Sequence, residues 1–293
     1  MDFPRSVASR LEYIEFLIQF RGYVSRIDLM DSYGIKEAAA TRDFKLYNEI
    51  SLGLNMEMNK ASKRWELNAE TFEPCFELSA QTALSKLRNS SISKAVGLES
   101  GVEAPNRLSL PKVEILSTIT RAIANKTAVE IEYVAASRSG KKIQISPHAI
   151  VDNGIRWHVR AYDRVENRYW DFVLGRIKAA QNMKELISPD EGVNGDIQWN
   201  RKVKLILMPH PNKENLQNRE SILCEYGMDE NGEREVYVRA AVAGYWLRLW
   251  NVDCSKEHSG EGKHYQLCLK NPETLYDVSS AAIAPEFDSH LVL

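Results

Sequence analysis

The sequence predicts an α+β protein of several domains, and three observations lead to this fold class. Apolar residues recur at helical spacing through the first fifty residues, and two short alternating segments follow. From residue 128 the apolar period changes to two, as in antiparallel strands. After a Gly- and Pro-containing stretch at 188–199, strand and helix patterns alternate to the end. We predict an N-terminal winged helix-turn-helix, a helical connector, a small SH3-like or Sm-like β-barrel and a C-terminal ferredoxin-like α+β extension.

These changes of pattern also give the predicted domain boundaries. They are a DNA-binding domain at 1–68, a helical connector at 69–127, a ligand-sensing barrel at 128–188, a linker at 189–199 and a dimerisation extension at 200–293. At 293 residues the chain is long enough for two or three domains of ordinary size.

The first 50 residues predict three helices joined by tight turns. One amphipathic stripe comprises Leu11, Ile14, Leu17 and Ile18. Ser25 is a suitable N-cap for a short second helix, and Gly34 lies in the turn that follows it. A third helix from about residue 36 to residue 50 places Ala40, Phe44, Tyr47 and Ile50 at core spacing. This order is the helix-turn-helix pattern.

Two short alternating segments at 54–58 and 64–67 predict a β-hairpin with a polar, basic tip at 59–63. A hairpin directly after a helix-turn-helix makes a winged helix. The third helix would then enter the major groove, where Arg42 can read guanine and Thr41 or Lys45 can contact phosphate or a thymine methyl. The alternative is an ordinary solvated helix face. The predicted DNA-binding residues are Ser25, Thr41, Arg42, Lys45, Asn48, Lys60, Lys63 and Arg64.

The charge of the predicted DNA-binding domain is balanced. Residues 1–68 hold ten Lys or Arg and ten Asp or Glu, and the whole chain has a net charge of −2. Non-specific affinity for DNA should therefore be modest. We expect tight binding to need two copies that read two half-sites about one helical turn apart.

Between residues 128 and 188, alternating patterns predict strands near 129–133, 142–151, 155–163 and 168–177. In the third, Trp157, Val159 and Ala161 should point to one face, and Arg156, His158 and Arg160 to the other. Like charges on one face repel, so an anionic ligand or a set of carboxylates should lie over them. The alternative is a solvated outer face. The carboxylate candidates are Asp163, Asp171 and Glu132.

Several short motifs resemble the WYL-domain transcriptional regulators. The triplet Trp157-His158-Val159 aligns with the Trp-Tyr-Leu triplet that names this family, although its middle residue departs from the tyrosine. The supporting matches are Ile131-Glu132-Tyr133, Ser137 with Gly140, Ser146-Pro147-His148, Arg160-Ala161-Tyr162-Asp163 and Gly175-Arg176-Ile177. The chain looks most similar to the BrxR and CapW type, which is associated with phage-defence operons.

This resemblance implies a homodimer that binds double-stranded DNA at an inverted-repeat operator and represses a phage-defence operon. It also implies that the barrel senses a nucleotide or oligonucleotide, and it adds residues from neighbouring strands to the basic face. The predicted ligand-binding residues are Tyr133, Ser137, His148, Arg156, His158, Arg160 and Arg176. Arginine forks suit phosphate, and residues 128–188 carry ten Lys or Arg against seven Asp or Glu.

The C-terminal stretch predicts strands at 203–208, 236–243 and 264–269, and helices at 214–225 and from residue 245. In the second helix Trp246, Leu249 and Trp250 lie at helical spacing. They predict a protein core or a dimer interface rather than a cofactor site.

Other classes of protein fit the sequence less well. His148 and His158 with Asp163 or Asp171 could suggest metal-dependent hydrolysis, but the sequence contains no His-x-x-x-His, His-x-Glu, paired-carboxylate or Gly-rich phosphate motif. A nucleic-acid-processing enzyme is therefore a weak alternative, and no cofactor or metal is expected. Four dispersed cysteines and the lack of a long apolar run or secretory signal predict a cytoplasmic protein without membrane contact. A DNA-binding scaffold or an activator without a small ligand remains open.

Overall fold

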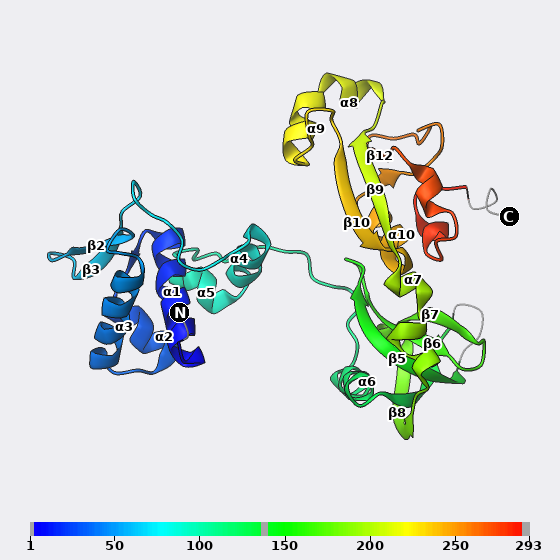
Figure 1. Cartoon of the computed structure of the whole chain (residues 1–293), viewed down its shortest axis with the longest axis horizontal. Helices are drawn as coiled ribbons and strands as arrows, with labels where there is room; N and C mark the ends of the chain where they lie inside the picture. Colours follow the sequence, from blue (N-terminus) through cyan, green and yellow to red (C-terminus); the bar gives the residue numbers. More distant parts are fainter. Residues whose placement is uncertain (1–2, 136–139, 289–293) are drawn as a thin grey trace. The chain divides into compact units, whose positions relative to one another are not determined.

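The computed structural model describes residues 3–135 and 140–288. The chain forms two compact units, Met1–Asn106 and Arg107–Leu293. Within these described residues, no helix is long and apolar enough to cross a membrane. Figure 1 shows the elements of each unit along the chain.

The first unit contains the predicted helix-turn-helix and wing. Its helices and strands are α1 (Arg5–Arg21), β1 (Tyr23–Val24), α2 (Arg26–Tyr33), α3 (Glu37–Ile50), β2 (Met56–Asn59) and β3 (Arg64–Leu67). Helices α1 and α2 both end at a glycine with positive φ, Gly22 at +84° and Gly34 at +62°. The strands form an antiparallel sheet in the order β1-β3-β2. The predicted winged helix is confirmed.

The core of the first unit brings together the apolar faces of its helices. The fully buried stripe of α1 includes Leu11, Ile14, Leu17 and Ile18, as predicted. Two further helices, α4 (Ala80–Leu87) and α5 (Ser90–Ala95), lie against the same core. Ala83 of α4 is buried in it, and Ile92 of α5 packs against it. The segment predicted as a connector thus begins within the first unit.

The second unit begins with a helix and a five-stranded antiparallel sheet. These elements are α6 (Val113–Asn125), β4 (Thr127–Tyr133), β5 (Lys141–Asp152), β6 (Trp157–Asp163), β7 (Arg168–Val173) and β8 (Ile177–Leu186). The strand order is β7-β6-β5-β4-β8. One face of the sheet packs on Ile115, Ile119 and Ala122 of α6. Strand β8 was not among the predicted strands.

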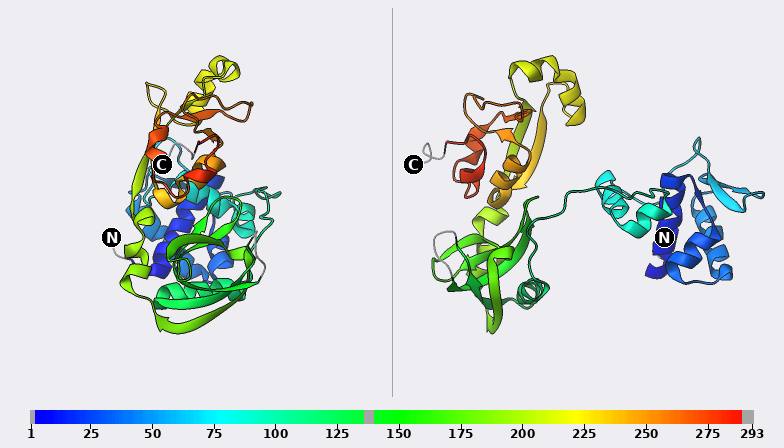
Figure 2. Two further views of the ribbon diagram at one scale, coloured as in Figure 1. Left: turned by 90° about the vertical axis from the view of Figure 1, so that its right-hand side faces the viewer. Right: turned by 180° about the vertical axis from the view of Figure 1, so that it is seen from behind.

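The prediction of a closed SH3-like or Sm-like barrel is wrong. The strands curl strongly (Figure 2), but β7 and β8 remain the two edges of the sheet in the part of the chain that the structure describes. Closure requires a matched strand tilt and stagger around the whole sheet. Those quantities depend on long-range pairing, which alternation within one strand does not specify.

After the sheet, two 3₁₀ turns, η2 (Pro189–Glu191) and η3 (Val193–Gly195), and the short helix α7 (Ile197–Asn200) lead into a second sheet. The elements that follow are β9 (Lys202–Pro209), α8 (Lys213–Gln217), α9 (Arg219–Glu225), β10 (Arg234–Arg239), α10 (Ala240–Leu249), β11 (Val252–Asp253), β12 (Leu267–Leu269) and the 3₁₀ helices η4 (Pro272–Leu275) and η5 (Ala281–Ile283). Helix α10 begins five residues earlier than the sequence predicted.

The prediction of a ferredoxin-like extension is also wrong. The strand order is β10-β9-β12-β11, with β9 antiparallel to both neighbours and β11 parallel to β12. A ferredoxin-like module requires two split β-α-β units in one antiparallel sheet. Here β9 and β10 form an antiparallel pair joined by α8 and α9, so no such unit forms.

Candidate functional site

The third helix of the first unit presents a polar face. Phe44 and Tyr47 are buried, as the spacing predicted, whereas Thr41, Arg42 and Lys45 are exposed. Asn48, one turn further on, is half-buried. The side chains proposed to read DNA therefore lie on the accessible face of α3.

These polar side chains differ in how strongly the protein itself holds them. The Thr41 hydroxyl donates to the Glu37 carbonyl at 2.9 Å, and Lys45 Nζ lies 3.9 Å from Glu49 in an exposed pair. Exposed pairs of this kind contribute little to stability. Among the residues described, the Arg42 guanidinium has no hydrogen-bond or ion-pair partner. It is free to contact a ligand.

Contacts behind α3 fix its position in the unit. The carboxylate of Asp43 is buried and accepts bonds from Arg10 Nε at 2.6 Å and Nη2 at 3.1 Å. On the other side, the Phe44 ring stacks on Trp65 of the wing, with ring centroids 6.0 Å apart. A paired guanidinium and an aromatic stack thus couple the helix to α1 and to the hairpin.

The wing carries three exposed basic side chains, Lys60, Lys63 and Arg64. Its tip is shaped by Asn59 Oδ1, which accepts from two backbone amides at 3.0 and 3.2 Å. Lys63 has a φ of +56°, and the Arg64 guanidinium lies 4.5 Å from the centre of the Tyr23 ring. Two lysines therefore project from a defined turn, while Arg64 is partly held against the domain.

Ser25 lies at the N-cap of α2, as predicted, and its polar groups are engaged. Its backbone N–H and its hydroxyl both donate to Asp28 Oδ2 at 2.7 Å. Asp28 also accepts from Arg21. Ser25 thus has a structural role at the start of α2, and any contact with DNA would add to it.

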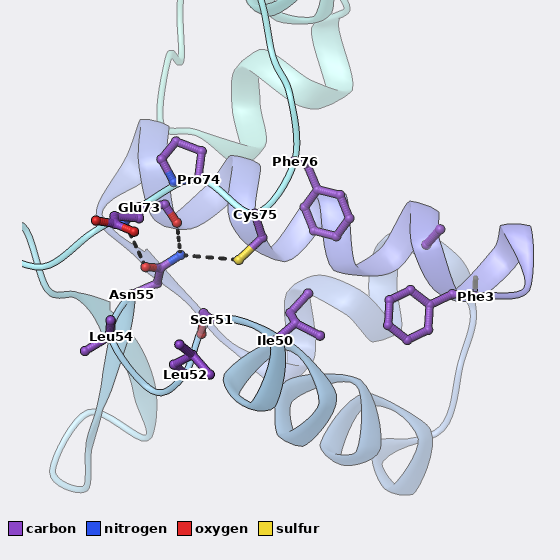
Figure 3. Close-up of a pocket in the computed structure, with 11 residues that line it drawn as sticks. Phe3, Ile50, Ser51, Leu52, Leu54, Asn55, Glu73, Pro74, Cys75 and Phe76 are labelled. Atoms are coloured by element: carbon purple, nitrogen blue, oxygen red, sulfur yellow. Dashed lines mark hydrogen bonds between the residues drawn. The ribbon is translucent and has the colours of Figure 1, made fainter. Parts of the chain in front are cut away.

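The first unit also holds a cavity of about 550 Å³ beside the end of α3 (Figure 3). Its lining is largely apolar, and Asn55 hydrogen-bonds the Glu73 carbonyl and the Cys75 thiol there. The buried Glu15 holds this segment by accepting from the Cys75 and Phe76 amides at 2.8 and 3.0 Å. No basic side chain lines the cavity, so it does not suit an anionic ligand.

In the second unit, strand β6 shows the predicted alternation. Val159 and Ala161 are fully buried in the core beneath α6, with Trp157 packed against them. His158 and Arg160 point to the opposite face, yet they are also buried, at 4% and 3% exposure. This second face is covered by the linker and by α10.

Carboxylates from two segments neutralise Arg160. Its Nε and Nη2 donate to the two oxygens of Asp196 at 2.7 and 3.1 Å, and its Nη1 reaches Asp171 at 3.4 Å. His148 Nε2 lies 3.1 Å from Asp196 Oδ2, the oxygen that also accepts from Arg160 Nε. Burial raises the pKa of Asp196, but hydrogen bonds from His148 and Arg160 outweigh this and hold the pKa well below its usual range.

His158 is in a different electrostatic environment from Arg160. Its ring packs on Tyr245 of α10, with centroids 5.2 Å apart, and Tyr245 in turn donates to Asp171 at 3.1 Å. Burial, followed by the positive charges of Arg156 and Arg176, lowers the pKa of His158 to about 4. The imidazole is therefore neutral near pH 7.

The other predicted ligand residues are not brought into one pocket. Tyr133 is buried in the sheet core and accepts from the Val173 amide at 3.2 Å. Arg156 is half-buried and lines a cavity with His158, whereas Arg176 is exposed. Ser137 lies outside the described residues.

Comparison with known families gives three matches along the chain. Residues 6–88 match the BrxR transcriptional regulator winged helix-turn-helix domain, residues 114–182 the WYL domain, and residues 202–275 the BrxR transcriptional regulator C-terminal dimerization domain. The chain is 32% identical over 277 residues to the DNA-binding transcriptional repressor CapW of Escherichia coli (strain KTE188), covering 91% of this chain and 90% of that protein. The chain belongs to the BrxR/CapW family of WYL-domain transcriptional regulators.

Other similar proteins extend this comparison. CapW of Pseudomonas aeruginosa is 29% identical over 278 residues, covering 92% of this chain and 90% of that protein. Among solved structures, the proteasome accessory factor PafBC of Arthrobacter aurescens matches with a TM-score of 0.31 and 14% identity, over 94% of this chain and 46% of that one. The curated relatives are described as transcriptional repressors, which confirms the prediction of a regulator rather than an enzyme.

Sequence reasoning missed the groups that cover the basic face of the WYL domain. It named Asp171 as a possible partner for the arginines, and Asp171 does contact Arg160. It did not foresee Asp196, which follows β6 by more than 30 residues, or Tyr245. The only local signal was the position of Asp196 before Trp199, whose amide it caps at 3.1 Å.

Proposed function

We propose that this regulator is a DNA-binding transcriptional repressor that acts as a homodimer on an inverted-repeat operator. The exposed polar face of α3, flanked by the two lysines of the wing, carries this proposal. Relatives that align over nine-tenths of the chain are named as DNA-binding transcriptional repressors. The match of residues 202–275 to a dimerization domain supports a dimer, which supplies the two recognition helices that an inverted repeat needs.

Within this proposal, Arg42 reads a base edge in the major groove, while Thr41, Lys45, Lys60 and Lys63 contact the phosphate backbone. The assignment follows from exposure and from the absence of any partner for Arg42 in the described part of the chain. Asn48 and Arg64 lie at the border of this surface, and Ser25 supports it by capping α2. The operator then adjoins a phage-defence operon, as the family resemblance implies.

The WYL domain senses an anionic ligand, a nucleotide or an oligonucleotide. Arg156, His158 and Arg176 remain candidates to contact it. Within the described residues the two guanidiniums have no carboxylate partner, and the neutral His158 ring has an Nδ1 atom without a hydrogen-bond partner. Tyr133, His148 and Arg160 are already engaged with other groups of the protein, so they position the site rather than contact the ligand. The ligand acts by preferring one of two arrangements of the dimer.

The test is a footprint of the purified full-length protein on the DNA immediately upstream of its own gene, at controlled salt. We expect two protected half-sites related by a two-fold axis. The first compact unit alone, residues 1–106, should give no footprint at the same concentration, because it can occupy only one half-site. Equal affinity for fragment and full-length protein would contradict a dimeric repressor.

A scaffold without a small ligand is the second candidate function. It is favoured by the burial of Arg160 and His148, whose interactions join the sheet to the linker. Addition of nucleotides and short oligonucleotides to the operator complex distinguishes the two, because only a sensor changes its affinity for the operator.

A further inference from the structure

A small cavity lies in the second unit where the start of β6 meets helix α10. Its volume is about 160 Å³. The sheet side contributes Arg156 and His158, and α10 contributes Tyr245 and Arg248. Ile155, Leu249 and Ile283 add apolar surface to the lining, and Asn153 adds a polar side chain. The cavity is therefore shared by the WYL domain and by the region that matches a dimerization domain.

The two arginines of this cavity differ from the other arginines nearby. Arg160, Arg164 and Arg107 each donate to at least one carboxylate. By contrast, neither Arg156 nor Arg248 has a hydrogen-bond or ion-pair partner for its guanidinium within 3–135 and 140–288. The nearby Asp152 is already held by Arg107 through two bonds of 2.7 and 2.8 Å. The guanidiniums of Arg156 and Arg248 are thus left without an ion-pair partner among the described residues.

The imidazole of His158 adds a second, independent sign of a missing partner. The side chain is 4% exposed, and its Nδ1 atom has no hydrogen-bond partner among the residues that the structure describes. Buried polar atoms are nearly always bonded, and an orphan requires an explanation. His158 also lines the cavity, and its ring, neutral near pH 7, carries one N–H that can donate to an acceptor there.

We propose that this cavity binds a terminal phosphate group, with Arg156 and Arg248 on its oxygens and His158 as a further donor. Two separate guanidiniums suit phosphate, which offers several oxygens and up to two negative charges. The volume is below the 300–1,000 Å³ or so that encloses a whole small ligand. Only the phosphate end enters, and the rest of a nucleotide or oligonucleotide extends outward. This site rests on the ligand-sensing function proposed above.

Such a ligand would join two parts of the second unit. Arg156 precedes β6, whereas Arg248 and Tyr245 lie on α10, so one phosphate held by both arginines bridges them. The approach here is already close, because a Cβ added at Gly154 would lie 2.6 Å from Leu249 Cδ1. Binding therefore favours the arrangement in which α10 packs on the sheet. In this way ligand binding can change the arrangement of the dimer.

The experiment is calorimetric titration of the full-length protein, freed of nucleic acid by high salt, with three probes. These are a short single-stranded oligodeoxynucleotide with a 5′-phosphate, the same strand with a 5′-hydroxyl, and inorganic phosphate. We expect the 5′-phosphate to strengthen binding by about tenfold or more. The variants Arg156→Gln and Arg248→Gln should each remove most of that gain. Arg219→Gln, an exposed arginine of the same unit outside the cavity, should retain it.

The outcomes separate this site from the repressor proposal. Equal affinity for the two strands, or an Arg248→Gln protein that binds like Arg219→Gln, would overturn the phosphate site. So would the absence of binding to every probe. Inorganic phosphate that binds as tightly as the phosphorylated strand would support the site with free phosphate as its source.

Operator binding without a probe is measured on the same proteins. If the wild-type protein binds its operator and fails to bind all three probes, only the phosphate site is wrong. If Arg248→Gln loses operator binding in the absence of a probe, Arg248 acts in domain packing and the site is also overturned. If the wild-type protein has no operator, the repressor proposal fails whatever the probes show.

Discussion

The winged helix and the WYL domain both present a row of basic side chains, but they use them in different ways. On α3, Arg42 and Lys45 extend into solvent from a helix whose opposite face is core. On β6, Arg160 is buried and donates to two carboxylates, and the neighbouring His158 is neutral. The difference shows that residue type alone does not identify a ligand contact. What matters is whether the protein already supplies the counter-charge.

The largest effect is expected where the protein supplies that counter-charge itself. Replacing Asp196 by Asn removes the carboxylate that Arg160 and His148 share and leaves Arg160 only its longer contact with Asp171. Breaking a buried pair of this kind costs about 3–5 kcal/mol. Urea unfolding of the full-length protein, followed by tryptophan fluorescence, measures the loss, because five of the six tryptophans lie in the second unit.

The matched control for this change is Glu185→Gln. Glu185 pairs with Arg164 at 2.9 Å but is more than half exposed, so its loss should cost about 0.5 kcal/mol or less. Equal losses for Asp196→Asn and Glu185→Gln would mean that the buried network does not stabilise this unit.

On the winged helix the expected effect is on DNA and not on folding. Arg42→Ala should weaken operator binding by about 1–3 kcal/mol and relax the preference for one base pair, because a bidentate contact to guanine would be lost. Quantitative gel shifts on the operator and on a single-base variant measure both effects. Thermal unfolding should stay unchanged, since Arg42 has no partner within the described residues. A loss of stability would show instead that Arg42, like Arg160, makes contacts that stabilise the fold.

Because His158 is neutral in the folded protein, the free energy of unfolding of the second unit should depend on pH. No such dependence is expected for the winged helix. The pKa of His158 is about 4, below the unfolded value near 6.5, so its contribution is complete above pH 6.5 and is lost as the pH falls toward 4. Between pH 7.5 and pH 5 we expect a loss of about 1–2 kcal/mol, allowing for solvent screening. The difference in unfolding free energy between wild type and His158→Gln isolates this contribution. A difference that is independent of pH would contradict a lowered pKa.

The smallest effect is expected at the tip of the wing. Lys60→Ala should weaken binding to every DNA sequence by a similar factor and reduce the slope of log K against log salt by about one. Titrations at several salt concentrations on operator and non-operator DNA test this. A change in sequence preference would show that the wing reads bases, as α3 is proposed to do.

The first unit was predictable from sequence because its features are local. The stripe of Leu11, Ile14 and Leu17 and the Ser25 cap each depend on residues a few positions apart. Such periods predict a helix before any tertiary contact is known. The exposure of Arg42 follows from the same period, because its helix must bury the opposite face.

The sequence by itself determined which residues share a face of β6, since alternation is a property of the strand backbone. It could not determine what covers that face. Asp196 and Tyr245 reach it only because the linker and α10 fold back onto the sheet, over separations of 36 residues or more. The open edges of the five-stranded sheet and the order of the C-terminal strands were likewise decided by long-range pairing. Local periodicity specifies elements and faces, but burial and charge compensation depend on contacts that exist only in the folded chain.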